Sequence, residues 1–210
     1  MRRALIVCAL VGVACVVAQA VLHFLDMWLW DWRYSELDAG SGSGIFEIVG
    51  KFALVVATAA VWTLVAAGGP ERRSRLTLAL LMSFLVVDGM FTLQAHFGQY
   101  WPVVYLPILA PTGVLLWRMA ALQQPEPRRY IRAAVLLLGL SPFGEKVLGR
   151  ILAHLGQAPG DTLYELKVVV TQSCELLGWI LLASGLVAVA VVSNTTRRRK
   201  EALAPARAAG

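Results

Sequence analysis

Six apolar runs divide the chain, and short polar segments separate them. A helix rises about 1.5 Å per residue, so about 20 apolar residues span the roughly 30 Å hydrocarbon core of a bilayer. The runs are too long and too continuous for barrel strands, which alternate apolar and polar residues. The pattern therefore predicts an all-α, polytopic membrane bundle of six transmembrane helices: Ala4–Leu25, Ile45–Gly68, Leu76–Phe97, Val103–Leu122, Ile131–Leu155 and Val168–Ser193.

Composition supports a membrane protein. Hydrophobic residues make up 58% of the chain and charged residues 15%, against about 45–50% and about 25% in soluble domains. This excess excludes a soluble enzyme, a disordered chain and a secreted disulfide scaffold. The three cysteines, Cys8, Cys15 and Cys174, lie inside apolar runs and have no CxxC or Cys/His spacing, so we expect neither disulfides nor a metal site.

The basic residues predict the orientation of the bundle. In a six-pass arrangement 14 of the 19 Lys and Arg residues fall on one side, and the loops on the other side hold Arg33 and five acids. Because cytoplasmic loops are enriched in Lys and Arg, we expect a multi-pass inner-membrane protein with both termini cytoplasmic. The basic residues on that side are Arg2, Arg3, Arg72, Arg73, Arg75, Arg118, Arg128, Arg129, Arg132, Arg197, Arg198, Arg199, Lys200 and Arg207.

The two chain ends allow more than one interpretation. Residues 1–20 can be read as a signal peptide, because Arg2-Arg3 precede an apolar core and Ala18-Gln19-Ala20 resembles a cleavage site. The apolar run continues to Leu25, which favours a first span. Residues 1–196 are predicted to form the transmembrane domain, and the basic residues 197–210 a disordered cytoplasmic tail. A juxtamembrane role explains this basic run, so we expect no nucleic-acid partner.

Ionisable residues within the predicted spans fall in their outer halves, whereas the inner halves are almost purely Leu, Val and Ala. Asp88 is the deepest, about 12 Å below the outer edge of the hydrocarbon core. Charges inside a membrane are costly and mark functional sites by default, and their absence from the inner halves disfavours a continuous pore. The candidate ligand, proton or ion-binding residues are Asp88, His96, Glu145, Glu175, Glu47, Lys51, Lys146 and Arg150.

Helical spacing assigns roles to these residues. Glu47 and Lys51 are four residues apart, so they share a helix face and can pair. Asp88, Glu145 and Glu175 are expected to serve as proton or cation sites, and the basic residues to pair with them or to hold an anionic group. Ser141-Pro142-Phe143-Gly144 predicts a kink, or a break that would start a half-helix near Glu145.

Three functions fit this pattern. The leading hypothesis is an outward-facing ionisable pocket that binds or transports an ion, a small solute or a lipid headgroup. The alternatives are a membrane enzyme that acts on a lipid-linked substrate at the outer leaflet, and an accessory subunit that meets a membrane-protein partner. His23, His96 and His154 lie on three different spans without local metal-ligand spacing, so we expect no metal and no cofactor.

Overall fold

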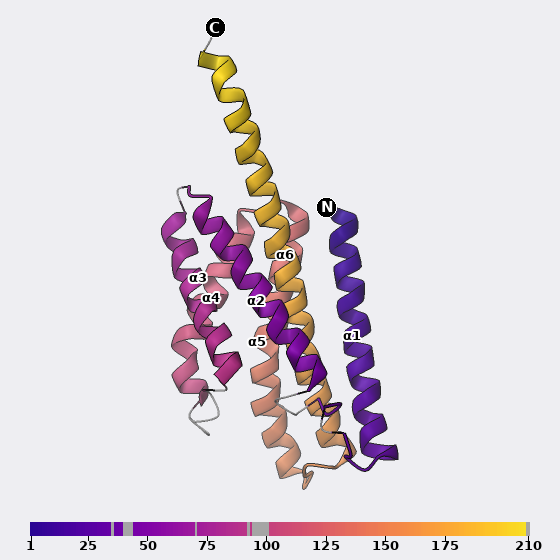
Figure 1. Ribbon diagram of the computed structural model, residues 1–210. Coiled ribbons are helices and arrows are strands. Elements are labelled where there is room, and N and C mark those ends of the chain that lie inside the picture. The colour runs from indigo at the N-terminus through magenta and orange to yellow at the C-terminus, as the bar shows by residue number, and fades with distance from the viewer. Residues whose placement is uncertain (35, 40–43, 70, 92, 94–100, 209–210) are drawn as a thin grey trace.

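The computed structural model describes residues 1–34, 36–39, 44–69, 71–91, 93 and 101–208. This part of the chain contains helices and no strand, which confirms the predicted all-α class. The helices run beside one another as an elongated bundle (Figure 1). They are α1 (Arg2–Leu29), α2 (Ile45–Ala66), α3 (Arg72–Phe91), α4 (Trp101–Ala121), α5 (Pro125–His154) and α6 (Thr162–Ala208).

Five of these helices, α1, α2, α3, α4 and α6, are long and apolar enough to cross a membrane. The chain is therefore a multi-pass membrane protein. α5 is 30 residues long, but it carries Arg132, Glu145, Lys146 and Arg150, and it does not belong to this apolar set. The sequence predicts six spans. Whether α5 is one of them depends on how its charged side chains are kept from lipid.

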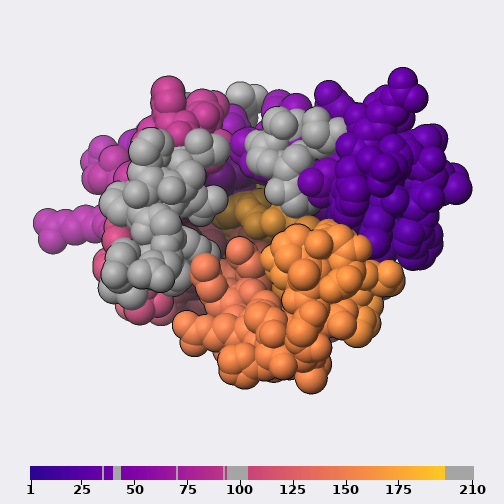
Figure 2. Space-filling view, turned by 90° about the horizontal axis from the view of Figure 1, so that it is seen from below, coloured from indigo at the N-terminus to yellow at the C-terminus, as the bar shows by residue number. Residues whose placement is uncertain are grey.

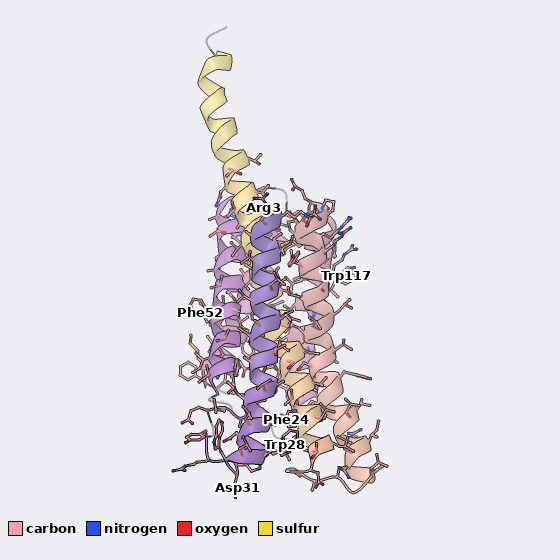
Figure 3. All side chains as sticks on the ribbon, turned by 90° about the vertical axis from the view of Figure 1, so that its right-hand side faces the viewer. Arg3, Phe24, Trp28, Asp31, Phe52 and Trp117 are labelled. Atoms are coloured by element: carbon pink, nitrogen blue, oxygen red, sulfur yellow. The ribbon has the colours of Figure 1, made fainter. Side chains whose placement is uncertain are left out.

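The outer surface of the bundle is apolar. Large hydrophobic side chains are exposed along the helices, among them Phe52 on α2 (68% exposed) and Trp117 on α4. Figure 3 shows Phe52 and Trp117 projecting away from the helix axes. In water such a surface would drive aggregation, whereas in a bilayer it contacts acyl chains.

α6 is the central helix of the bundle. It packs against α1, α2 and α5, and the pairs α2–α3, α3–α4 and α4–α5 complete the packing around it. Leu182 and Leu186 of α6 are fully buried with Val61 of α2, Met82 of α3 and Ile131 of α5 in one apolar core.

Glycines on α6 allow this close packing. A Cβ atom on Gly185 would lie 2.8 Å from Ile131 Cγ1, and one on Gly178 would lie 2.7 Å from Leu138 Cγ. Both positions face α5. Without a hydrophobic driving force between helices in lipid, such small residues let the backbones approach and gain van der Waals contact.

The two ends of the bundle differ in charge. Both termini lie at one end, where Arg2 Nε is 3.6 Å from Glu126 Oε1, and we call this the basic end. Arg3 is located there, while Phe24, Trp28 and Asp31 are near the opposite end (Figure 3). That opposite end, formed by residues 30–39 and 155–161 with their neighbouring helix turns, is called the acidic end.

Two helices are longer than the apolar runs that predict them. α5 continues as a single helix through Pro142, so no half-helix begins at Glu145. α6 continues as helix to Ala208, beyond residue 196, and projects beyond the bundle (Figure 1). Ala, Leu, Glu, Arg and Lys dominate that segment, and they are the strongest helix formers, so the preceding span continues without a stop.

The α5–α6 contact supplies the first testable prediction. Gly185→Leu places a side chain where even a Cβ atom would lie only 2.8 Å from Ile131 Cγ1. Overpacking of this kind costs about 1–3 kcal/mol. We expect a lower free energy of unfolding in detergent. Gly139→Leu on α5 is the matched control, because nothing lies within 4 Å of a Cβ atom there. Equal stability of the two variants would contradict the close approach of α5 and α6.

Candidate functional site

Three carboxylates from three helices lie in the half of the bundle nearer the acidic end. Glu175 of α6 is partly buried, and Glu47 of α2 and Glu145 of α5 act on it electrostatically. Trp179 Nε1 donates to Glu175 Oε1 at 3.5 Å, and the buried Ser141 of α5 lies near the same carboxylate. We call Glu47, Glu145 and Glu175 the carboxylate cluster.

The acidic end is hollowed above this region. Figure 2 looks onto that end and shows α6 at the bottom of a recess, with α2 and α5 on two of its sides. The helices that border this recess are those that carry the carboxylate cluster.

Glu47 also forms an ion pair within its own helix. Lys51 Nζ is 2.7 Å from Glu47 Oε1, one turn away, and both side chains are 31% exposed. A Cβ atom on Gly89 of α3 would lie 3.9 Å from Lys51 Cγ, so the lysine stem packs at the α2–α3 contact. The spacing of these residues in the sequence predicts this pair.

Asp88 lies at the α3–α4 contact with a phenol as its hydrogen-bond donor. Tyr105 Oη donates to Asp88 Oδ1 at 2.5 Å, and Asp88 and Tyr105 are 7% and 2% exposed. Sequence reasoning missed Tyr105, because a tyrosine in an apolar span carries no spacing signal of its own. The bond ties the deepest predicted carboxylate to α4.

The remaining predicted residues are placed less centrally. Lys146 of α5 is partly buried, and Glu145 and Arg150 of the same helix are exposed. Arg150 therefore does not share the burial of Asp88 or Glu175. His96 lies outside the described residues.

The residues described by the structure contain no group of three His, Cys, Asp or Glu side chains arranged for a metal ion. His23 of α1 is fully buried between two carboxylates, but they approach opposite nitrogens of its ring. One ion cannot be bound by both carboxylates and the ring together in that arrangement.

The sequence did not identify the polar face of α1 as a candidate site. Gln19, His23 and Asp26 are 3%, 0% and 0% exposed, although they lie in a helix whose other surface is largely apolar. Their spacing of four and three residues places them on one face of the helix, and this was the available signal. Sequence reasoning considered His23 only as a metal ligand and Asp26 only as a loop acid.

A separate cavity of about 260 Å³ opens between α3 and α4 at the basic end. Its walls are apolar at Leu78, Leu115 and Met119, and Arg75 and Arg118 line it as well. Arg75 also donates from Nη1 to the carbonyl oxygen of Gly68 at 3.1 Å, which satisfies a carbonyl just beyond the end of α2.

The fold and these contacts define a polytopic α-helical membrane protein with ionisable side chains in one half of its bundle. The chain belongs to the family described as Domain of unknown function (DUF8692), whose model matches residues 42–190. That range includes every residue of the carboxylate cluster, Lys51, Asp88 and Tyr105. Neither a curated protein nor a solved structure matches the chain.

The Asp88–Tyr105 bond generates a stability prediction. Tyr105→Phe removes one hydrogen-bond donor from a buried carboxylate, and a loss of this kind costs about 1–3 kcal/mol. We expect a lower free energy of unfolding in detergent, whereas Tyr34→Phe, at an exposed tyrosine, should leave it unchanged. In the Asp88→Asn background the cost of Tyr105→Phe should shrink, since the two residues interact. Equal effects in both backgrounds would show that the bond contributes nothing.

Proposed function

We propose that this protein crosses the inner membrane six times, with both termini in the cytoplasm, and binds a small inorganic cation or a proton in an outward-facing pocket for transport. The observation that carries the proposal is the convergence of Glu47, Glu145 and Glu175 from three helices. Two like charges repel the partly buried Glu175 carboxylate, and a bound cation or proton relieves that repulsion.

The charge balance favours a cation over an anion. Among the predicted site residues that the structure describes, four carboxylates (Glu47, Asp88, Glu145 and Glu175) stand against three basic groups (Lys51, Lys146 and Arg150). Lys51 is already paired with Glu47 at 2.7 Å. The formal excess of negative charge therefore selects against anionic ligands.

The proposed orientation follows from the basic end. Cytoplasmic loops retain Lys and Arg, so the end with Arg2 and Arg72 would face the cytoplasm and the acidic end the opposite side. α5 would be the sixth span, because it packs along α6 and against α4 over its length. Six crossings would return both termini to the same side, and this agrees with their common position at one end of the bundle.

A second function is favoured by a specific observation. Asp88 is bound by Tyr105 and Glu47 is bound by Lys51, so part of the polar network is satisfied within the bundle. Such pairs fix helix positions without any ligand, as in an accessory subunit of a membrane complex. Removing a residue of a structural pair strands its partner and destabilises the bundle.

Orientation can be tested by cysteine labelling. In a background with Cys8, Cys15 and Cys174 replaced by Ala, we expect Glu36→Cys to react with a membrane-impermeant maleimide on intact cells. Ser74→Cys should react only after the membrane is opened. Both positions are exposed, so differences in burial do not explain different labelling. The reverse pattern would place the acidic end in the cytoplasm.

Cation binding can be tested by ligand stabilisation. A cation at about 100 times its dissociation constant stabilises the folded protein by about 2.7 kcal/mol. We expect one of Na⁺, K⁺, Mg²⁺, Ca²⁺ or H⁺ to raise the unfolding temperature of the purified protein at constant ionic strength. Glu175→Gln should lose this response, and Glu36→Gln, which changes an exposed acid outside the cluster, should keep it.

The same variant separates the two functions. If the cluster is a cation site, Glu175→Gln relieves repulsion and is at least as stable as the wild type without added cation. If the cluster is structural, the variant is less stable under every condition. A wild type that responds to no cation and to no change of pH would contradict the proposed function.

A further inference from the structure

The polar face of α1 forms a second site together with the chain that follows it and the start of α6. His23 is fully buried, with Nδ1 3.3 Å from Asp38 Oδ1 and Nε2 3.3 Å from Glu165 Oε2. The edge of the Trp32 ring meets the imidazole, with ring centroids 5.3 Å apart. We call His23, Trp32, Asp38 and Glu165 the His23 site.

A cavity adjoins the His23 site at the acidic end. It has a volume of about 370 Å³, and its lining includes Trp32, Asp38 and Glu165, the three residues that surround the histidine. Pro159, Gly160 and Val168 complete the lining. The cavity therefore combines two carboxylates with an aromatic ring and apolar walls.

The hydrogen bonds of His23 indicate a neutral imidazole. The backbone N–H of Ala39 donates to Nδ1 at 3.1 Å, so Nδ1 acts as the acceptor and the ring proton belongs on Nε2, facing Glu165. Nε2 is buried and makes no hydrogen bond of good geometry. In this state the imidazole provides no positive charge to balance Asp38 and Glu165.

Other charged groups around the histidine do not reverse this balance. Asp26, one turn further along α1, accepts a hydrogen bond from the Tyr34 backbone N–H at 3.0 Å and adds negative charge. Lys167 of α6 is buried, and its Nζ lies 4.3 Å from the centre of the Tyr164 ring. Against the Lys167 ammonium group and the exposed Arg33 guanidinium, which lies 5.9 Å from the centre of the Tyr34 ring, the region contains three carboxylates, including Glu165, which also accepts from the Gly160 N–H at 2.8 Å.

The shape of the site selects the kind of cation. The imidazole separates Asp38 from Glu165, so an inorganic ion with oxygen ligands at about 2.0–2.6 Å cannot reach both carboxylates. An organic ammonium ion carries its charge on an apolar body, which suits a cavity with an aromatic wall and carboxylates at more than one position. Trp32 has a positive φ of 59° and Asp31 one of 50°, an uncommon conformation for these residues that presents the indole at this wall.

We propose that the His23 site binds an organic ammonium group and exchanges it for a proton on His23. When the ring takes up a proton, Nδ1 and Nε2 both become donors towards Asp38 and Glu165, and the site supplies its own positive charge. An ammonium ligand and this proton then compete for the same two carboxylates. This site is separate from the carboxylate cluster and does not depend on the function proposed for it.

Choline is the probe, and calorimetry of the full-length protein in detergent is the measurement. We expect saturable binding that weakens as the pH is lowered, because a proton on the imidazole competes with choline for the carboxylates. Titrations in buffers of different ionisation enthalpy should show about one proton released per bound choline, because binding and proton release are linked. Absence of choline binding to the wild type would overturn the proposal.

Variants identify the residues responsible. Glu165→Gln should weaken choline binding about tenfold or more, as expected for the loss of one contact to a charged group. Glu36→Gln is the matched control and should bind like the wild type. His23→Gln should bind choline without releasing a proton. Trp32→Leu keeps every charge and should also weaken binding, so it provides a second test if Glu165→Gln does not fold.

The lipid composition of nanodiscs distinguishes a lipid headgroup from a free amine as the source of the ammonium group. In nanodiscs of phosphatidylcholine, binding of free choline should be lost if lipid headgroups occupy the site, whereas in phosphatidylglycerol it should remain. Equal affinity in both lipids would assign the site to a free amine. Unchanged affinity in both Glu165→Gln and Trp32→Leu would overturn the site, and wild-type binding without proton release would overturn the exchange. Glu175→Gln should leave choline binding intact, which distinguishes this site from the carboxylate cluster.

Discussion

The close packing of α6 against α1, α2 and α5 is the contact on which the rest of the structure depends. Gly178 and Gly185 bring α5 to within van der Waals distance, and Gly12 of α1 does the same opposite Leu177, where a Cβ atom would lie only 2.9 Å away. Lipid provides no hydrophobic force between helices, so these approaches supply the dispersion contacts that hold the bundle. The carboxylate cluster and the His23 site each include a residue of α6, whereas the Asp88–Tyr105 bond joins α3 to α4.

The placement of charge follows from the cost of desolvation. The buried core around Leu182 and Leu186 contains no ionisable residue among those described, and the charges of the spans are located towards the ends. Where a charge does enter the bundle, it has a partner on another element or one turn away, as Asp88 has in Tyr105 and Glu47 in Lys51. Pairing reduces the penalty, and closeness to the acidic end allows partial hydration.

The sequence predicted the elements better than their contacts. Apolar runs determine helix positions because each span must satisfy its own backbone hydrogen bonds, and the Glu47–Lys51 pair follows from spacing within one helix. The Asp88–Tyr105 and His23–Glu165 contacts join different helices and depend on how each helix is rotated about its axis. No pattern in a single sequence specifies that rotation. In α1, the spacing of Gln19, His23 and Asp26 shows that they share one helix face. The sequence does not show that this face meets the start of α6.

Glu165 and Glu175 connect the two sites through one helix. Ten residues of α6 separate them, about 15 Å along the axis, so screened electrostatics between the two carboxylates is weak where water reaches them. Mechanical coupling has a more direct route, because α1 contacts α6 at two places. Gly12 lies beside Leu177, and His23 lies beside Glu165. A change in the charge of His23 alters the attachment of α1 to the first turn of α6, whereas Gly178 and Gly185 hold the following turns against α5. If the two sites bind ligands as proposed, the acidic end of α6 is the segment on which either ligand would act without disturbing the core.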